Sequence, residues 1–211
     1  MVKQDLHDLI LCSRGKVRDL YQSTDGFLSD KHLLFVASDR ISAFDNVMGT
    51  EVPEKGRLLT TMSEFWFHKL GHICRNHFVT TELHAMPACI RENEAYFSGR
   101  VMIVEKMQVL PVEAIVRGYI TGSAWKEYSI KGTVHGIEMP KGLVECQALP
   151  GPLFSPSTKA SSGEHDQNIH PSQCECYEFS MLIEVQEIVG QSMSKEIERV
   201  SLKLYAEVSH T

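Results

Sequence analysis

The chain has 211 residues, 43% of them hydrophobic, with a formal net charge of −6 and a pI near 5.9. This length and apolar content suffice for one large or two small domains. The acidic balance and the scatter of the basic residues argue against nucleic acid as a partner. Every apolar run is far shorter than the roughly 20 residues of a membrane span, and the N-terminal sequence resembles neither a secretory signal nor a transit peptide, so we expect no membrane partner.

The six cysteines lie far apart along the chain, unlike the dense framework of a disulfide-stapled secreted domain. We therefore expect reduced thiols and a cytoplasmic protein. A zinc site built from Cys174, Cys176, His165 and His170 is an alternative, although zinc-binding cysteine pairs usually have two residues between them rather than one.

The first half of the chain is predicted to be mainly extended. Short apolar runs bounded by Gly, Ser and Asp are typical of strands joined by tight turns. Strands are predicted at residues 9–12, 17–21, 33–38, 78–81 and 101–107.

Three segments have apolar residues at helical spacing. Residues 58–73 form the clearest pattern, residues 124–131 form a shorter helix that Gly132 ends, and residues 194–208 form the last helix. Residues 139–171 are rich in Pro, Gly, Ser and Thr, so we expect a long loop region there.

The most informative stretch is residues 109–123, VLPVEAIVRGYITGS. It reads as an apolar strand that carries Glu113 and Arg117 and then ends in a turn of small residues that includes Ser123. A buried arginine is costly unless it binds something anionic, so this stretch indicates an anion site. A pair between Arg117 and Glu113 within a sheet is the structural alternative.

A second basic turn lies near the N-terminus, at residues 14–19 (RGKVRD). Gly15 lets backbone amides approach an anion, and Lys16 and Arg18, alternating on a strand, can reach phosphate oxygens on the same side. The turn lacks the spacing of a P-loop, and an ordinary exposed turn is the alternative.

Two further polar clusters attract interest. Residues 38–45 (SDRISAFD) directly follow a predicted strand, where sites tend to lie, although Asp and Ser also form Asx-turns at such positions. Residues 155–166 offer hydroxyls, Lys159 and the pair His165–Asp166, which suit a phosphate, carboxylate or metal site, or else an exposed loop.

Taken together, these stretches resemble the SAICAR synthetase family of de novo purine synthesis, in its eukaryotic, fungal-like branch. The resemblance runs from Gly15 to about Tyr205, and the stretch at residues 109–128 matches a highly specific signature of that family. The stretches that carry it are GKVRDLY at 15–21, SDRISAFD at 38–45, PEKGRLLTTMSEFWF at 53–67, VLPVEAIVRGYITGSAWKEY at 109–128 and FSPSTKASSGEHDQNI at 154–169.

The resemblance implies an ATP-dependent ligase that joins the carboxylate of 5-amino-1-(5-phosphoribosyl)imidazole-4-carboxylate to the amine of L-aspartate and releases ADP and phosphate. Because a carboxylate is a poor acyl donor, we expect ATP to phosphorylate its oxygen before the amine displaces phosphate. The implied partners are these small molecules and Mg²⁺, and the protein is expected to be a monomer or a homodimer.

For ATP, the resemblance implies a phosphate loop and a hinge beside the adenine, as in the N-terminal lobe of protein kinases. The residues implied for ATP are Gly15, Lys16, Arg18, Glu105, Lys106 and Met107. Catalytic roles are implied for Lys159, Asp45 and Arg117. The residues implied to bind the ribotide or aspartate are Ser42, Arg117, Ser123, Lys159, His165 and Asp166.

The implied fold is α+β and has two lobes. Residues 1–107 are expected to form an ATP-binding lobe with an antiparallel sheet, like the kinase N-terminal lobe. Residues 108–211 are expected to form an incomplete substrate lobe of the ATP-grasp-like kind.

Two features depart from the family pattern. The Asp-x-Lys-x-Glu-Phe-Gly strand that supplies metal-binding carboxylates in the family is absent, so the metal ligands are unknown. Substantial turnover by this chain would mean that Asp39, Asp45 or Asp166 holds the metal instead. Residues 174–183 resemble an insertion. We therefore expect this chain by itself to show little turnover, and a non-catalytic nucleotide-binding isoform or fragment is the alternative function. A kinase-like phosphotransferase is a further alternative, although the H-R-D and D-F-G triplets are absent.

Overall fold

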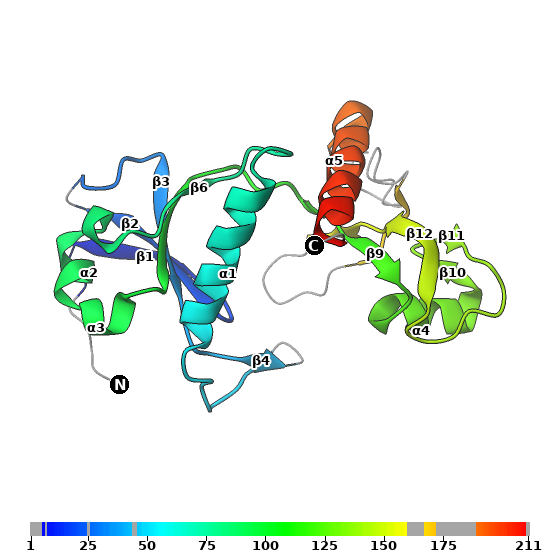
Figure 1. The fold of residues 1–211 in the computed structure, drawn as a ribbon, viewed down its shortest axis with the longest axis horizontal. Helices are drawn as coiled ribbons and strands as arrows, with labels where there is room; N and C mark the ends of the chain where they lie inside the picture. The colour runs from blue at the N-terminus through cyan, green and yellow to red at the C-terminus, as the bar shows by residue number, and fades with distance from the viewer. Residues whose placement is uncertain are drawn as a thin grey trace, which may run out of the picture. The chain divides into compact units, whose positions relative to one another are not determined.

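The computed structural model describes residues 6, 8–24, 26–43, 46–159, 167–171 and 189–209. The chain divides into two compact units, Met1–Gln108 and Val109–Thr211 (Figure 1). Both units combine helices with antiparallel strand pairs, so the predicted α+β class is confirmed. No helix within these described ranges has both the length and the apolar character needed to cross a bilayer.

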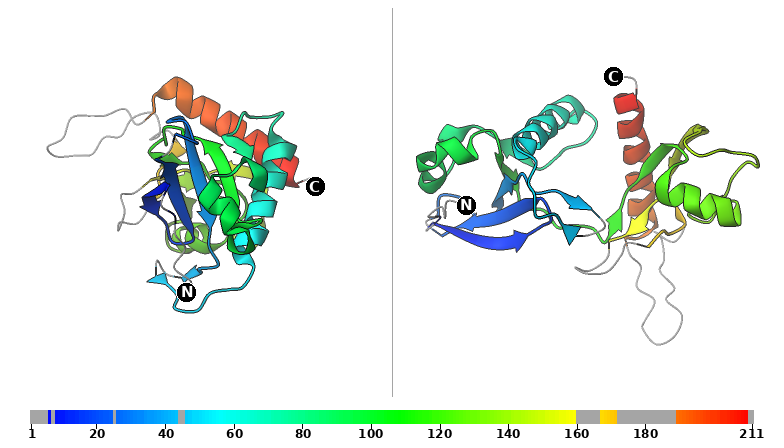
Figure 2. Two further views of the ribbon diagram at one scale, coloured as in Figure 1. Left: turned by 90° about the vertical axis from the view of Figure 1, so that its left-hand side faces the viewer. Right: turned by 90° about the horizontal axis from the view of Figure 1, so that it is seen from below.

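The first unit is built on a five-stranded antiparallel sheet. In spatial order its strands are β1 (Leu9–Arg14), β2 (Arg18–Ser23), β3 (His32–Ala37), β7 (Val101–Glu105) and β6 (Phe78–Thr80). β1 and β2 form a hairpin at one edge of the sheet (Figure 2, dark blue). All five predicted strands are confirmed, because alternating apolar residues between turn residues identify strands well.

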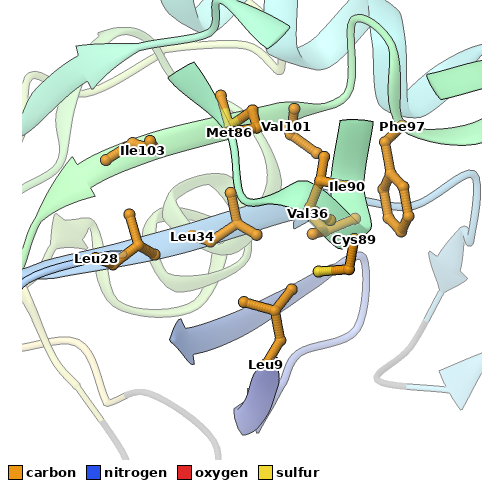
Figure 3. Close-up of a cluster of buried hydrophobic side chains, with 10 residues drawn as sticks. All are labelled: Leu9, Leu28, Leu34, Val36, Met86, Cys89, Ile90, Phe97, Val101 and Ile103. Carbon is orange, nitrogen blue, oxygen red and sulfur yellow. The ribbon is translucent and has the colours of Figure 1, made fainter. Parts of the chain in front are cut away.

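One face of this sheet carries the main apolar core of the first unit (Figure 3). Leu34 of β3 and Ile103 of β7 are paired and lie on this face, where they pack with Ile90 and Phe97. The latter two residues come from a run of short helices, namely η1 (Leu83–Ala85), α2 (Ala88–Glu92) and α3 (Glu94–Phe97). These helices were not predicted, because helices this short show no apolar period.

The other face of the sheet is covered by α1 (Lys55–Leu70), as Figure 1 shows. The ring of Phe35 in β3 lies 5.7 Å from that of His77, which lies 5.2 Å from that of Phe67 in α1. The predicted helix is confirmed, but it begins and ends earlier than predicted, because the chain leaves the helix at Gly71 for a hydrogen-bonded turn. A short ladder of β4 (Ser42–Ala43) and β5 (Asn46–Val47) precedes it.

Over residues 109–159, 167–171 and 189–209, the second unit contains three antiparallel strand pairs and two helices. The pairs are β9 (Val116–Tyr119) with β12 (Ala148–Phe154), β8 (Val112–Glu113) with β13 (Ser157–Thr158), and β10 (Thr133–Val134) with β11 (Ile137–Glu138). The helices are α4 (Gly122–Lys131) and α5 (Gln191–Ser209), and both confirm predicted helices. Gly132 ends α4 with φ of 72°, as its position predicted.

Two predictions for the second unit are wrong in part. Residues 139–171 contain β12 and β13 and are therefore not one long loop. The sequence did not predict β12 because this strand includes Pro150 and Pro152. A register shift between Ala148 and Leu153 accommodates the two prolines. The predicted turn at 121–123 is the start of α4, and the strand before it is divided into β8 and β9.

We predict that Gly56→Ala destabilises the first unit. Gly56 lies at the start of α1, and a Cβ atom there would be 2.6 Å from the carbonyl oxygen of Ala37. Since backbone must move to relieve this contact, we expect a loss of about 1–3 kcal/mol in the free energy of unfolding, measured by urea denaturation. Gly49→Ala is the control, because a Cβ at Gly49 meets no atom within 4 Å. Equal stability of the two variants would contradict the close approach of α1 to β3.

Candidate functional site

The loop between β1 and β2 is held by residues that follow β3. The Ser38 hydroxyl donates to the Val17 carbonyl at 2.8 Å, and the Ser38 backbone N–H donates to the same oxygen at 3.0 Å. The Arg40 guanidinium donates from Nη2 to the Gly15 carbonyl at 3.1 Å and from Nε to the Lys16 carbonyl at 3.3 Å. Two motifs that are separate in the sequence therefore form one structure.

Arg40 is held in turn by Asp19 of β2. Hydrogen bonds of 2.7 and 3.1 Å link the guanidinium to the two carboxylate oxygens, and Nε of Arg14 lies 3.4 Å from the same carboxylate. Asp19 is only 7% exposed, and its hydrogen bond raises the pKa of Arg40. Sequence reasoning proposed no functional role for Asp19 or Arg40, although both lie inside the quoted motifs.

Arg18 begins β2 and is half-buried against one aromatic ring. Its guanidinium carbon lies 5.3 Å from the ring centroid of Phe35, and burial lowers the pKa of Arg18. Burial, followed by the charge of Arg18, lowers the pKa of His77. Gly15, Lys16 and Arg18 thus lie at one hairpin, and their contact with phosphate stays a prediction.

Asp39 holds α1 onto the sheet. Its Oδ1 atom accepts the backbone N–H of Gly56 at 2.8 Å and lies 3.0 Å from Nη1 of Arg100, whose side chain is 6% exposed. Burial opposes the charge of Asp39, but the bonds from Gly56 and Arg100 outweigh it and lower the pKa of Asp39. The Oδ1 atom of Asp39 is thus engaged in holding α1 and Arg100.

The predicted hinge residues end β7 and follow it. Glu105 forms hydrogen bonds of 2.8 and 2.9 Å with Nη2 of Arg75. The backbone N–H of Lys106 donates to the Lys31 carbonyl at 2.6 Å, so this group is not available to a purine. Met107 is exposed.

Several predicted residues lie outside the described part of the chain: Asp45, His165 and Asp166, together with Cys174 and Cys176 of the alternative zinc site. Ser42 is half-buried in β4. Within the described ranges, no group of three His, Cys, Asp or Glu side chains is arranged to hold a metal ion.

Arg117 of β9 donates to two hydroxyl groups. Its Nη1 donates to the Ser155 hydroxyl and, at 3.3 Å, to the Ser155 carbonyl, and its Nη2 donates to the Ser123 hydroxyl at 3.3 Å. Burial lowers the pKa of Arg117, and the charge of Glu127 opposes this effect. The alternative pairing of Arg117 with Glu113 is wrong, because Glu113 pairs with Lys159 at 3.3 Å. Arg117 and Ser123 therefore form a predicted cluster that the structure does bring together.

A polar cavity of about 680 Å³ opens beside Ser123. Its lining includes Glu127, Lys131, His135, Asn168 and His170. Among the described residues, this lining contains two candidates from the sequence: Ser123, and His170 of the alternative zinc site. The sequence could have pointed to this cavity, because Glu127 lies inside the family signature at residues 109–128.

Glu127 connects three segments around this cavity. It accepts hydrogen bonds from the Thr133 hydroxyl (2.8 Å), the Gly136 backbone N–H (3.0 Å) and the Asn168 side chain (3.3 Å). Burial opposes its charge, but these donors outweigh burial and lower the pKa of Glu127. The carboxylate therefore stays charged beside Arg117 and fixes the turn after β10.

His135 is buried at that turn, with φ of 50° and 2% exposure. Its Nδ1 lies 2.7 Å from the Pro156 carbonyl, and because a carbonyl only accepts, Nδ1 carries a proton. Burial lowers the pKa of His135, which favours the neutral ring. His135 thus ties the turn after β10 to the segment that contains Ser155.

Residues 11–211 match the model of the SAICAR synthetase family. This chain belongs to the SAICAR synthetase family. The recognised resemblance is therefore confirmed, and the sequence motifs now correspond to the two clusters described here: the loop held by Ser38 and Arg40, and the Arg117 cluster.

Individual SAICAR synthetase relatives support the assignment. The chain is 50% identical to the phosphoribosylaminoimidazole-succinocarboxamide synthase of Schizosaccharomyces pombe, over 90% of this chain and 58% of that protein. The structure of SAICAR synthase from Saccharomyces cerevisiae in complex with SAICAR matches with a TM-score of 0.81 and 42% identity, over 98% of this chain and 64% of that one. A more distant match, 22% identical with a TM-score of 0.65 over 93% of this chain and 66% of that chain, is a SAICAR synthetase in complex with ADP, and it shows the shared fold. The chain spans about three fifths of the length of the curated relative from S. pombe.

We predict that Asp39→Asn lowers the free energy of unfolding at pH 7 by about 3 kcal/mol, because Arg100 then keeps a buried charge without its partner. The pKa of Asp39 is lower in the folded state, so the carboxylate stabilises the fold at neutral pH and this contribution is lost as the pH falls through that folded-state pKa. The stability difference between the parent protein and the variant should therefore shrink in acid, as measured by urea unfolding across pH. The exposed Asp30→Asn is the control. A difference that is independent of pH would contradict the role of the Asp39 charge.

Proposed function

We propose that this chain carries the nucleotide and ribotide sites of an ATP-dependent ligase that joins 5-amino-1-(5-phosphoribosyl)imidazole-4-carboxylate to L-aspartate. The products would be SAICAR, ADP and phosphate. The observation that carries this proposal is the Arg117–Ser123 cluster at the start of α4, beside a polar cavity, in a chain 42% identical to a structure that holds SAICAR.

The Arg117 cluster suits the phosphate of the ribotide. A guanidinium and a hydroxyl at the N-terminus of a helix provide two donors in a region where the helix dipole favours negative charge. Ser123 lies in the first turn of α4, and Arg117 reaches it from β9. The cavity next to Ser123 then offers Asn168, Lys131 and Glu127 to the polar remainder of a sugar phosphate.

Lys159 is proposed to act on the carboxylate end of the reaction. It lies 3.3 Å from Glu113, and both side chains are partly exposed, at 47% and 39%. An exposed ion pair is weak, so an anionic substrate can replace Glu113 at little cost. Lys159 would then stabilise the charge that develops as the carboxylate is phosphorylated and the amine displaces phosphate. Ser42 and Asp45 are proposed to act on the ribotide, with Asp45 as a catalytic residue, and His165 and Asp166 are proposed to bind aspartate.

In the first unit, Gly15, Lys16 and Arg18 are proposed to bind the ATP phosphates. Glu105 and Met107 are proposed to lie beside the adenine, which the backbone N–H of Lys106 cannot read because it is bonded to Lys31. When bound, Mg²⁺ would neutralise phosphate charge. The described residues do not provide a carboxylate set that fits Mg²⁺, so the roles proposed for this chain rest on its cationic and hydroxyl side chains.

We further propose a cytoplasmic monomer or homodimer without nucleic-acid or membrane partners. The net charge of −6 and the scattered cysteines support this view. Within the described part of the chain, Cys12, Cys74, Cys89 and Cys146 form no disulfide.

A coupled assay of ADP release, with the ribotide and aspartate each omitted in turn, tests the function. We expect ADP release that requires both substrates, together with formation of the amide product. Release that is independent of aspartate would instead indicate a kinase or ATPase, and ATP binding without any turnover would indicate the non-catalytic module. The names of the relatives favour the ligase over that module.

We predict that Arg117→Lys weakens ribotide binding by on the order of 1–3 kcal/mol and leaves ATP binding unchanged. Lysine keeps the charge but loses the planar fork that spans Ser155 and Ser123. Titration calorimetry with each ligand measures both affinities, and Arg199→Lys, at an exposed pair on α5, is the control. Unchanged ribotide affinity would restrict Arg117 to holding the two serines together.

A further inference from the structure

We infer that Arg40 is a positioning residue that fixes the loop Gly15–Val17 in the shape that receives the ATP phosphates. The nature of the ligand rests on the proposed function. The inference concerns how the protein holds the loop, and it rests on the hydrogen bonds of Arg40, Ser38 and Asp19.

The first step concerns the carbonyl groups of the loop. Within the loop, the Gly15 N–H donates to the Arg18 carbonyl at 2.8 Å. The carbonyl oxygens of the loop accept hydrogen bonds from residues outside it. Arg40 donates to the carbonyls of Gly15 and Lys16, and the Ser38 hydroxyl donates to that of Val17. Carbonyl oxygens repel phosphate oxygens, whereas N–H groups and cations attract them. Because donors occupy these carbonyls, the loop repels phosphate oxygens less, and the Lys16 ammonium supplies the attraction.

The second step shows that Arg40 does not itself bind phosphate. An arginine has five N–H groups. Nε donates to Lys16, Nη2 donates to both Gly15 and Asp19, and Nη1 donates to Asp19. The Arg40 charge is thus balanced by a carboxylate whose side chain is 10% exposed, and most of its donors are already used.

The third step explains why an arginine is needed. The bonds of Arg40 point in three directions from one rigid plane, toward two carbonyls and one carboxylate. A lysine has a single ammonium on a flexible stem and cannot span these acceptors at once. The Arg40 side chain is 21% exposed, so solvent screens these bonds only in part.

The test measures loop order and nucleotide affinity separately. In Arg40→Lys without ligand, we expect amide hydrogen exchange of residues 15–18 to rise about tenfold, while exchange of β3 and β7 stays unchanged. Titration calorimetry should show that the dissociation constant for ATP also rises about tenfold. Arg14→Lys is the matched control, because Arg14 contacts the same Asp19 carboxylate with a side chain that is 65% exposed; both readouts should stay within about twofold.

Asp19→Asn is a second variant that tests the same loop, in case Arg40→Lys folds poorly. The amide keeps the shape of the side chain but removes the charge that holds Arg40. Amide exchange of residues 15–18 and the dissociation constant for ATP should therefore both rise, by a smaller factor than in Arg40→Lys. The double variant should be no worse than Arg40→Lys alone, because both changes remove one anchor.

Two results overturn the inference: unchanged exchange in the loop, or faster exchange with unchanged ATP affinity. Failure of the parent protein to bind ATP would instead overturn the proposed function and the phosphate role of the loop with it. In that case the exchange measurement still decides whether Arg40 holds the loop.

Discussion

Three consecutive polar residues after β3 hold the first unit together around its candidate site. Ser38 and Arg40 bind the carbonyls of the β1–β2 loop, while Asp39 between them binds the start of α1 and Arg100. The helix that covers the sheet and the loop at its edge are thus anchored within three positions of the chain. Each anchor includes a charge or hydroxyl that is largely removed from water, and such a group is stable only while its partners stay in place.

In the second unit too, partly buried charged side chains are held by hydrogen bonds from several segments. Arg117 lies on a strand and meets hydroxyl groups of Ser155 and Ser123, while Glu127 is satisfied by Thr133, Gly136 and Asn168. Hydroxyls satisfy a guanidinium without neutralising it. Arg117 therefore keeps a positive charge that is only half-exposed, which is the physical requirement for binding an anion rather than for closing an internal ion pair.

The regular elements of this chain were largely accessible from its sequence. The strands of the main sheet and the three longer helices have clear apolar periods, and Gly132 marks the end of α4 as expected. The sequence did not predict the elements that lack an apolar period. The helices α2 and α3 are very short, and β12 contains two prolines and pairs with β9 through an irregular register. Their structure depends on the neighbours against which they pack.

The sequence by itself determined the family and most candidate residues, because local motifs such as GKVRDLY and VLPVEAIVRGYITGS are contiguous in the chain. Only the tertiary structure decided which side chains are partners. Lys159 pairs with Glu113 across 46 positions, and Arg40 with Asp19 across 21. Strand pairing brings such residues together, and burial then determines which charged groups must be paired. The spacing of residues within a motif predicts neither strand pairing nor burial. For that reason the sequence indicated Arg117 but named the wrong structural partner for it, and it pointed to the phosphate loop without the arginine that holds it.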